Sequence, residues 1–287
     1  AFPPGGGVDI VARAVSERLS ARLRQSFVVD NRPGAGTTIG TELAVKSAPD
    51  GYTLLVGPVG AALIAQIYYR KSYDMRRDLA AISKIGYGTI VLVVPPGLGV
   101  ASVKELIALA KAKPGQLTFA SSGTGSNIHL TGEMFKQRAG VDIVHVPYKG
   151  SALMLPDLIE GRVSMALDSM PAHLPHIKSG RLRALAVASL QRSAQLPDVP
   201  TISEAGVPGF QSNTDYALYA PAGTPKEIVA RLNRETVAVL AEPDLKARLA
   251  ALGIEVSGST PAALHAEVLA EFDKWAKVLK EGNIKQE

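Results

Sequence analysis

The sequence predicts an α/β protein with two lobes, in which each lobe has a mainly parallel sheet flanked by helices. Strand-like and helix-like segments alternate along all 287 residues, a pattern typical of parallel strands joined by crossover helices. Hydrophobic residues make up 46% of the chain, which is enough for one large or two medium domains with their own cores. Proline- and glycine-rich stretches follow two of the expected strands, near residues 95 and 221, and indicate crossings between domains.

The first expected helix is amphipathic, because Val8, Val11, Val15 and Leu19 recur at helical spacing. Further helices are expected over 37–48, 61–69, 102–115, 126–139, 152–160, 171–179, 224–240 and 260–282. Two of them open with capping-box patterns, Ser102 with Glu105 and Thr224 with Glu227.

Strands are expected where short apolar runs lie between these helices. Their ranges are 27–30, 52–57, 89–97, 117–123, 143–148, 163–168, 182–189 and 216–223. We therefore expect a discontinuous first lobe, residues 1–98 with 219–287, and a second lobe, 99–218, inserted into it. Two crossing strands would form a hinge, and the cleft between such lobes is a common place for a small ligand.

Charge and cysteine content exclude several classes of protein. There are 31 basic and 26 acidic residues, and the basic ones are dispersed, so no nucleic-acid partner is expected. Without cysteine the chain has no thiol nucleophile, thiolate metal site or disulfide. No apolar run approaches the roughly 20 residues of a membrane span, and no signal peptide is present. Because the sequence begins inside a motif, we expect that a leader and a first strand have been removed.

The stretch "FPPGGG", residues 2–7, is a candidate anion site. Pro3 and Pro4 restrict the backbone, and the three glycines allow close approach and positive φ. The following helix offers unpaired amides and the positive end of its dipole, which together bind an anion without a basic side chain. A tight turn without a ligand explains the same residues equally well.

The stretch "GAGTTIG", residues 34–40, resembles a dinucleotide-binding loop but has the wrong spacing and context. It reads G-x-G-x-x-x-G, and "NRP" separates it from the preceding strand. We expect a turn and a helix start here, with no nucleotide cofactor.

The strongest local signal is "ASSGTGSNIHL", residues 120–130, which predicts a strand, a polar loop and a helix. Its hydroxyls belong to Ser121, Ser122, Thr124 and Ser126, its glycines are Gly123 and Gly125, and Asn127 adds an amide. This composition favours a second anion site without a cation. The alternative is a helix cap with spare hydroxyls.

Ser126 with His129, His145 and Asp168 could form a hydrolase triad, but no G-x-S-x-G elbow is present. His145 fits a structural place in an alternating strand, and no histidine has metal-ligand spacing, so no catalytic or metal residue is assigned. Asp168 ends an expected strand, where ligands of open α/β sheets bind. It could accept a hydrogen bond from a ligand or cap the helix that follows.

Seven stretches occur in the order expected of one known family. They are "FPPGGGVDIVAR", "VVDNRPGAGTTIGTELAVKSAPDGYTLL", "FASSGTGSNIHLTGEMF", "VPYKGSALMLPDLIEGRV", "PAHLPHIKSGRLRALAVAS", "LPDVPTISEAGVPGF" and "YAPAGTPKEIVARLN". Over essentially the whole chain, the sequence resembles the Bug-type solute-binding proteins, the TctC-like receptors of tripartite tricarboxylate transporters. The resemblance implies a periplasmic receptor whose two lobes close on a small carboxylate like a Venus flytrap, without enzymatic activity or a cofactor.

The resemblance also implies which residues bind the ligand. One carboxylate would be held by backbone amides and ordered waters of two first-lobe loops. These are Phe2–Gly6, with Pro4, Gly5, Gly6 and the nearby Asp9, and Gly57–Ala61, with Val59, Gly60 and Ala61. The far end of the ligand would meet Ser122, Gly123, Thr124, Ser126 and Asn127, together with Asp168. Tyr148 and residues 213–216 are expected close to the cleft.

Two departures from the family pattern bear on the ligand. The second loop reads "GPVGAALIAQ", with fewer side-chain donors than is usual, which predicts a partly apolar ligand. Asp215 stands where many relatives have an aromatic residue, and it would meet an amine or hydroxyl of the ligand or point to solvent.

The sequence thus predicts a monomeric periplasmic receptor that captures a small organic carboxylate and delivers it to membrane transporter subunits. A ligand sensor for a signalling partner is the second interpretation, and the sequence does not separate the two. An enzyme would need a nucleophile beside a base or a cofactor fingerprint, and neither is found. The identity of the acid stays open.

Overall fold

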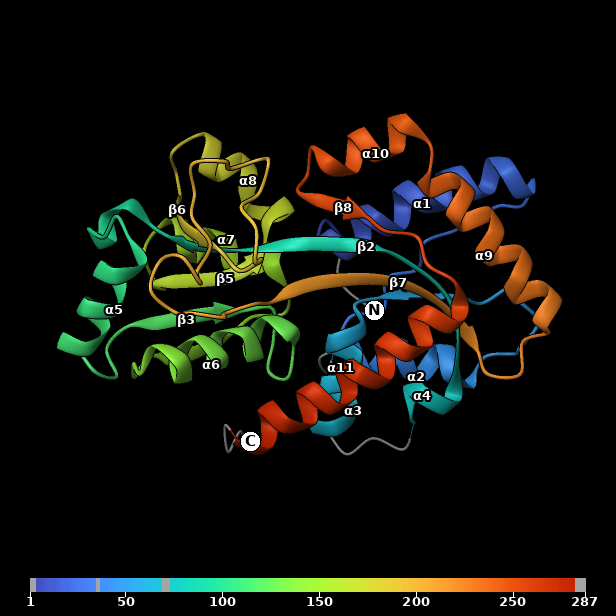
Figure 1. Ribbon diagram of the computed structural model, residues 1–287, viewed down its shortest axis with the longest axis horizontal. Coiled ribbons are helices and arrows are strands. Elements are labelled where there is room, and N and C mark those ends of the chain that lie inside the picture. The colour runs from blue at the N-terminus through green and yellow to red at the C-terminus, as the bar shows by residue number, and fades with distance from the viewer. Residues whose placement is uncertain (1–3, 35–36, 69–72, 282–287) are drawn as a thin grey trace. The chain divides into compact units, whose positions relative to one another are not determined.

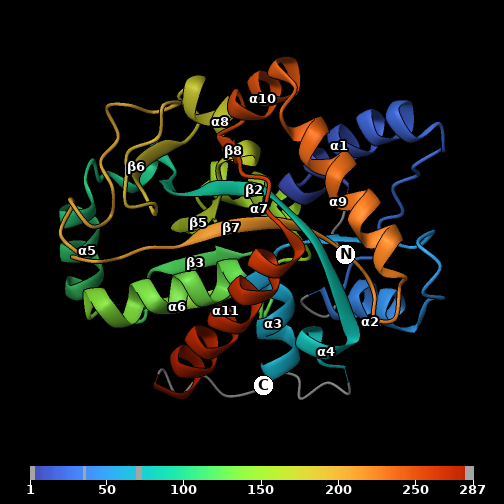
Figure 2. The same ribbon diagram turned by 45° about the vertical axis from the view of Figure 1, so that its right-hand side comes forward.

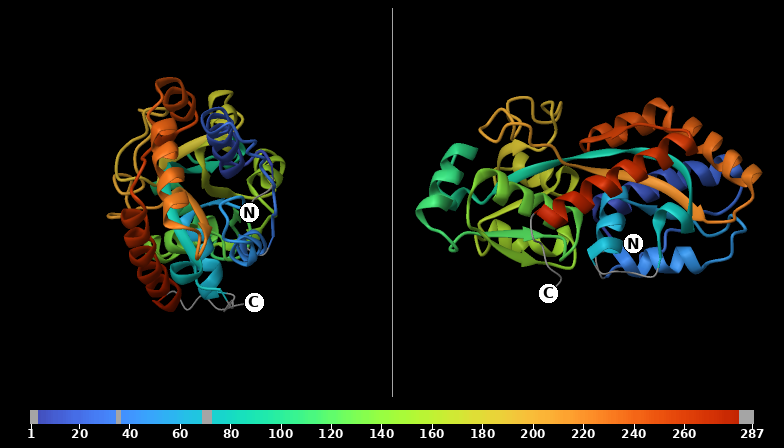
Figure 3. Two further views of the ribbon diagram at one scale, coloured as in Figure 1. Left: turned by 90° about the vertical axis from the view of Figure 1, so that its right-hand side faces the viewer. Right: turned by 60° about the horizontal axis from the view of Figure 1, so that its bottom comes forward.

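A computed structural model describes residues 4–34, 37–68 and 73–281 of the chain (Figure 1). The chain divides into two compact units, unit 1 from Ala1–Tyr87 with Asp215–Glu287, and unit 2 from Gly88–Thr214. It leaves unit 1 inside strand β2 (Leu79–Val94) and returns inside strand β7 (Asn213–Pro221). These two strands are neighbours in the sheet, as Figure 3 shows.

Unit 1 combines strands with helices from both ends of the chain. Besides parts of β2 and β7, it contains α1 (Gly7–Leu23), α2 (Thr38–Lys46), β1 (Leu55–Gly57), α3 (Val59–Tyr68), α4 (Met75–Asp78), α9 (Lys226–Leu240), α10 (Pro243–Ala250), β8 (Ile254–Val256) and α11 (Pro261–Glu281). Strand β1 pairs antiparallel with β7, with Leu55 opposite Tyr219, and β8 pairs with β2.

The core of unit 1 has two parts, one on each face of its strands. Along β7, Tyr216 and Leu218 belong to the cluster under α1 and α9, whereas Ala217 and Tyr219 belong to the cluster with α3 and α11. This alternation is the two-residue period of a strand buried on both faces. Figure 2 shows α1 beside α9 and α3 beside α11.

A close approach of backbones fixes β8 on β2. A Cβ atom on Gly86 would lie 2.2 Å from the carbonyl oxygen of Glu255, so only glycine fits at this position.

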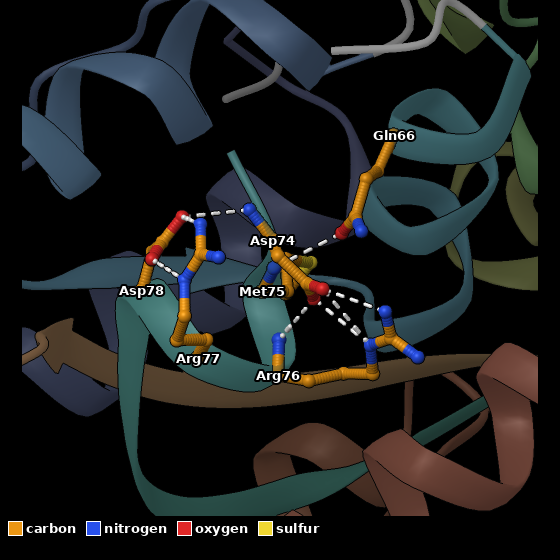
Figure 4. A network of polar contacts seen from close by, with 6 residues as sticks. All are labelled: Gln66, Asp74, Met75, Arg76, Arg77 and Asp78. Atoms are coloured by element: carbon orange, nitrogen blue, oxygen red, sulfur yellow. Dashed lines mark hydrogen bonds and ion pairs between the residues drawn. The ribbon is translucent and has the colours of Figure 1, made fainter. Parts of the chain in front are cut away.

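The short helix α4 is held by a polar network between α3 and β2 (Figure 4). Asp74 caps α4 by accepting from the Arg76 backbone amide at 3.0 Å, and its carboxylate also accepts from the Arg76 guanidinium. Gln66 on α3 accepts from the Met75 amide at 3.0 Å. Hydrogen bonds from Arg76 lower the pKa of Asp74 to about 2, so Asp74 is ionised at neutral pH. Each of the six residues drawn in Figure 4 takes part in at least one of its dashed contacts, which gives the network a structural role.

Unit 2 places helices on both faces of one sheet. Besides parts of β2 and β7, it contains the 3-10 turn Pro96–Leu98, α5 (Val103–Ala112), β3 (Thr118–Ser121), α6 (Asn127–Ala139), β4 (Val144–Pro147), α7 (Ser151–Ile159), β5 (Met165–Ser169), α8 (Met170–Lys178) and β6 (Arg183–Val187). Ile90 and Leu92 of β2 pack on the side of α5 and α6, and Val91 and Val93 pack on the side of α7 and α8.

The sheet of unit 2 is mixed. Strand β3 pairs in parallel with β4 and β5, whereas β2 pairs antiparallel with β5 and β6. The carboxyl ends of β3, β4 and β5 therefore meet at one edge of the sheet, and α6, α7 and α8 begin at or shortly after those ends. This edge carries the polar loop that the sequence singles out.

The structure departs from the sequence expectations in several places. The described pairs are both parallel and antiparallel, so "mainly parallel" is corrected to mixed. Residues 27–30 form no strand, because they pair with no strand among the described residues, and the Val28 side chain is 84% exposed. Thr224 does not cap α9, since its hydroxyl donates to the Pro221 carbonyl and Pro225 is the N-cap residue.

Candidate functional site

The first predicted loop forms a turn that leads into α1. Gly5 has a φ of +82°, a conformation that side chains other than glycine rarely adopt. Gly6 is the N-cap residue, and its carbonyl accepts from the Ile10 amide at 3.1 Å. The amides of residues 7–9 precede this first helical hydrogen bond and lie at the positive end of the helix dipole. Such amides bind an anion without a cationic side chain.

Asp9 holds this turn in place. Its carboxylate accepts from the Gly5 amide at 3.0 Å, from Arg13 Nε at 3.1 Å and from Asn31 Nδ2 at 3.0 Å. Burial by itself would raise the pKa of Asp9, but these hydrogen bonds and the charge of Arg13 hold the pKa below its ordinary value. Asp9 is therefore ionised, and Arg13 balances its charge. The hydrogen bond from the Gly5 amide to Asp9 positions the loop. The spacing of Asp9 and Arg13, four residues apart on a helix, is a signal that sequence reasoning overlooked.

The second predicted loop connects a strand to a helix. Strand β1 ends at Gly57, α3 begins at Val59, and the Ala62 amide donates to the Pro58 carbonyl at 3.4 Å. Val59 is fully buried in the core of unit 1, so its side chain is no measure of how apolar a ligand is. Gly60 is also buried and Ala61 continues α3, which leaves backbone amides as the groups that this loop offers. Phe2, also predicted to bind, lies outside the described residues.

In unit 2, the loop between β3 and α6 is internally bonded. Ser126 is the N-cap of α6, and its hydroxyl accepts from the His129 amide at 3.1 Å. Gly123 and Gly125 have φ values of +131° and +75°. Asn127 donates through Nδ2 to the Asn213 carbonyl at 2.8 Å, which ties α6 to the start of β7. Residues 122–124 are half-buried, whereas Ser121 and Ser126 are buried.

Tyr148 is engaged by its own unit. Its amide donates to the Ser121 carbonyl at 3.0 Å, and its hydroxyl donates to Asp157 on α7 at 2.6 Å. Burial and the Asp157 carboxylate raise the pKa of Tyr148 to about 12. The Tyr148 backbone amide thus supports the start of the 121–127 loop, and the proton of the phenol is already used in the bond to α7.

The sequence allows two roles for Asp168, a ligand contact and a cap of α8. In the structure Asp168 does not cap α8. Its Oδ2 lies 2.9 Å from His173 Nε2, on α8, and both side chains are almost wholly buried. Asp168 Oδ1 has no hydrogen-bond partner among the described residues. His173 is a partner that the sequence did not single out.

Asp215 is paired inside unit 1. Its Oδ1 lies 3.1 Å from Lys84 Nζ, and the same ammonium contacts Glu267 on α11. Burial raises the pKa of Asp215 although Lys84 opposes the rise, and burial acts to lower the pKa of Lys84 while the two carboxylates raise it overall. Lys84 is thus the cationic partner of Asp215, a role that a ligand amine would otherwise fill.

The candidate residues of a hydrolase triad do not contact one another as a triad would, and each has a different partner. Ser126 accepts from a backbone amide, the His145 ring lies 2.6 Å from the Ser121 hydroxyl, and Asp168 pairs with His173. Ser121 is fully buried, and its hydroxyl contacts the His145 ring and accepts from the Gly123 amide within unit 2.

Three further observations delimit the site. Unit 1 contains a cavity of about 600 Å³ between α1, β1 and α9, lined mainly by apolar side chains such as Val15, Leu19 and Leu218. Residues 57–61 do not line it, so it is separate from the second loop. Within the described ranges, no cluster of three His, Asp or Glu side chains suited to a metal ion is found. Over the same ranges, no helix is both long and apolar enough to cross a bilayer.

The sequence profile of the TctC family, described as "Tripartite tricarboxylate transporter family receptor", matches residues 11–284. The chain belongs to the TctC family. Among solved TctC-like structures, Rpa4515 of R. palustris with adipate is 39% identical, covers 99% of this chain and 95% of its own, and superposes with a TM-score of 0.94. The periplasmic binding protein BugD is 32% identical over 100% of this chain and 96% of its own, with a TM-score of 0.94. MatC from Rhodopseudomonas palustris with bound malate is 30% identical over 97% and 96%, with a TM-score of 0.91.

These likenesses confirm the resemblance drawn from the sequence and the two-lobed α/β fold of periplasmic binding proteins. This TctC chain is thus a solute-binding protein by family, and BugD is described as a periplasmic binding protein. Two of them are described with a bound dicarboxylate, adipate or malate.

Proposed function

We propose that this TctC-family protein binds a small organic carboxylate in the periplasm and delivers it to the membrane subunits of a tripartite transporter. The observation that carries the proposal is the turn before α1. Its amides lie at the positive end of a 17-residue helix, and the nearby carboxylate of Asp9 is balanced by Arg13. The adipate and malate bound by two similar proteins support a carboxylate as the anion. BugD, a periplasmic binding protein of the same fold, supports the compartment.

In this proposal, the amides of residues 7–9 and of the second loop, residues 57–61, hold the carboxylate, while the Gly5 amide stays bonded to Asp9. The 122–127 loop and Asp168 of unit 2 contact the remainder of the ligand. Neutral donors at helix ends contribute roughly 0.3–1 kcal/mol each from the dipole, together with their hydrogen bonds, and suit reversible capture.

The direct test is thermal unfolding with adipate, malate and, as a control, adipamide, the neutral amide of adipic acid. A ligand at about 100 times its Kd adds about 2.7 kcal/mol of stability, which is a shift of several degrees for a chain of this size. We expect one of the acids to raise the melting temperature and adipamide to leave it unchanged. A larger shift with adipate than with the compact malate supports the partly apolar ligand. Equal shifts with the acid and its amide contradict carboxylate recognition.

A matched pair of variants tests the loop itself. Gly5 and Gly140 both have positive φ, and a Cβ atom on either meets nothing within 4 Å. Gly5→Ala and Gly140→Ala therefore introduce the same kind of backbone strain, the first in the proposed site and the second at the C-cap of α6. We expect Gly5→Ala to weaken acid binding about tenfold or more, and Gly140→Ala to lower only the melting temperature. Equal affinities for the two variants would remove this loop from the site.

Delivery to a transporter is tested by capture of detergent-solubilised membrane subunits on the immobilised protein. Retention that increases with ligand supports delivery. Retention of a soluble signalling protein in place of the membrane subunits supports the sensor interpretation.

A further inference from the structure

Three aromatic rings from three elements form a stack beneath the polar loop of unit 2. The Phe119 ring on β3 lies 4.9 Å from the His145 ring on β4, measured between centroids. His145 in turn lies 3.9 Å from His129, in the first turn of α6, with 22° between the ring planes. Gly132 makes room for Phe119, because a Cβ atom there would lie 2.2 Å from the Phe119 ring. The stack thus joins two strands to the helix that begins at the loop.

Both histidines of the stack are hydrogen-bonded to the loop. His129 Nδ1 accepts from the Gly125 amide at 3.1 Å, and His145 Nε2 lies 2.6 Å from the Ser121 hydroxyl. The same hydroxyl accepts from the Gly123 amide at 3.1 Å. The loop is therefore fastened at its start through His145 and near its end through His129.

The bond from Gly125 requires a neutral His129 ring, because a protonated Nδ1 carries a hydrogen and has no lone pair to accept with. Burial keeps it neutral and lowers the pKa of His129 to about 4. Burial, with His129 and Lys136 nearby, lowers the pKa of His145 to about 3. Two rings 3.9 Å apart would also repel each other if both were charged. The loop therefore has no positive charge from its histidines at neutral pH.

Ordinary core packing explains the stack but not the bond to the loop. A buried aromatic ring needs no acceptor directed at a loop amide, and any apolar ring would fill the same volume. The His129 acceptor ties up the Gly125 amide in the middle of the proposed binding loop, next to residues 122–124, which stay half-buried.

We propose that His129 is a positioning residue of the ligand-binding loop: its neutral Nδ1 holds the Gly125 amide and so fixes residues 122–126 in the conformation that binds the ligand. His145 fixes the His129 ring by stacking and fastens the start of the loop through Ser121. This proposal rests on the proposed function, since it assigns the 122–127 loop to the ligand.

Two variants separate positioning from packing. His129→Asn keeps an acceptor, because Asn Oδ1 takes the place of His Nδ1, whereas His129→Leu fills space without one. Both lose the ring, so both lower the melting temperature. Amide hydrogen exchange at Gly125 in the ligand-free protein reads the bond directly, and we expect exchange about tenfold faster or more in His129→Leu than in the wild type or His129→Asn. Affinity for adipate, as the probe acid, is expected to fall about fivefold or more in His129→Leu and to stay within about twofold in His129→Asn.

Equal Gly125 exchange in all three proteins overturns the proposal. Equal affinity in His129→Leu and the wild type also overturns it, whatever happens to the melting temperature. If the wild type binds no carboxylate, the proposed function fails. In that case the exchange rates still decide whether His129 fixes the loop.

Discussion

Asp168 Oδ2 lies 2.9 Å from His173 Nε2, and the two side chains are buried in unit 2 with exposures of 1% and 0%. A buried carboxylate is stable only with a partner, because its desolvation is not otherwise offset. We predict that His173→Leu destabilises the protein by about 3–5 kcal/mol, the usual effect of breaking a buried pair on one side.

The control for this pair is Asp168→Asn, which removes the charge but keeps a hydrogen-bonding group beside His173. We expect it to be the milder change by about 2 kcal/mol in urea unfolding. A His173→Leu variant as stable as Asp168→Asn would contradict the pairing. Because Asp168 is a proposed ligand contact, both variants are also compared for adipate affinity, which is expected to fall more for Asp168→Asn.

A second prediction concerns Lys84, whose ammonium group contacts both Asp215 and Glu267. Lys84→Met leaves two carboxylates together at a site where Lys84 and Asp215 expose only 15% and 17% of their side chains. We predict a loss of about 2–4 kcal/mol in urea unfolding, and a smaller loss for Asp215→Asn, which leaves the Lys84–Glu267 pair intact. Asp215→Asn is expected to leave acid affinity unchanged. A fivefold or larger drop in affinity would return Asp215 to the ligand site.

Gly132→Ala sets two effects of opposite sign against each other. Alanine in a helix interior is favoured over glycine by about 1 kcal/mol. The new Cβ would lie 2.2 Å from a fully buried Phe119 ring that is already stacked on His145, so the ring has no free space to move into. We expect the clash to win, with a net loss of about 1–3 kcal/mol and faster Gly125 exchange as the stack shifts. A stabilised variant would show that the ring adapts freely.

The pH dependence of stability tests the neutral histidine. The pKa of His129 is about 4 in the folded protein, against an ordinary value of 6.5, and burial is the main cause, with Lys136 adding to it. The unfolded chain therefore takes up a proton first as the pH falls. The contribution of His129 is fully present above pH 6.5, declines from pH 6.5 to about 4, and declines no further below that.

His129→Asn has no such proton, so its unfolding free energy should fall less steeply than that of the wild type over this range. The expected difference in slope is about 1.4 kcal/mol per pH unit, measured by urea unfolding at steps of half a unit. His145, Glu133 and Lys136 are present in both proteins. Because His129 contributes to the lowered pKa of His145, the slopes are compared in the upper half of this range, well above the His145 pKa of about 3. Parallel slopes would show that folding does not lower the pKa of His129.

Sequence reasoning found the elements with strong local signals. The Ser102 capping box opens α5 with the hydroxyl accepting from the Glu105 amide at 3.2 Å, and the glycine- and serine-rich loops do lead into α1 and α6. Sequence reasoning placed the start of β2 too far along the chain. Ser83, Gly86 and Gly88 interrupt the apolar run in the first part of the strand. It missed α10 and β8 altogether.

The side-chain pairs around the candidate site could not be predicted from the sequence. Lys84 and Asp215 come from strands that are neighbours in the sheet but far apart in the sequence, and His145 meets His129 only because β4 and α6 pack on β3. Asp168 and His173 are five residues apart across a strand–helix junction, for which no spacing rule exists. Local patterns predict which loops begin helices, whereas the partners that neutralise and hold those loops depend on the tertiary fold.

The chain passes from unit 1 to unit 2 inside β2 and returns inside β7. The two units therefore become complete at different times during synthesis on the ribosome. Unit 2 is one continuous stretch and is complete once residue 214 has emerged. The first 87 residues must wait for β7 and α9, which supply Leu218 and Leu232 to the core beneath α1. The segment with the turn before α1 is therefore translated before the inserted unit but acquires its final shape only after that unit is in a position to fold.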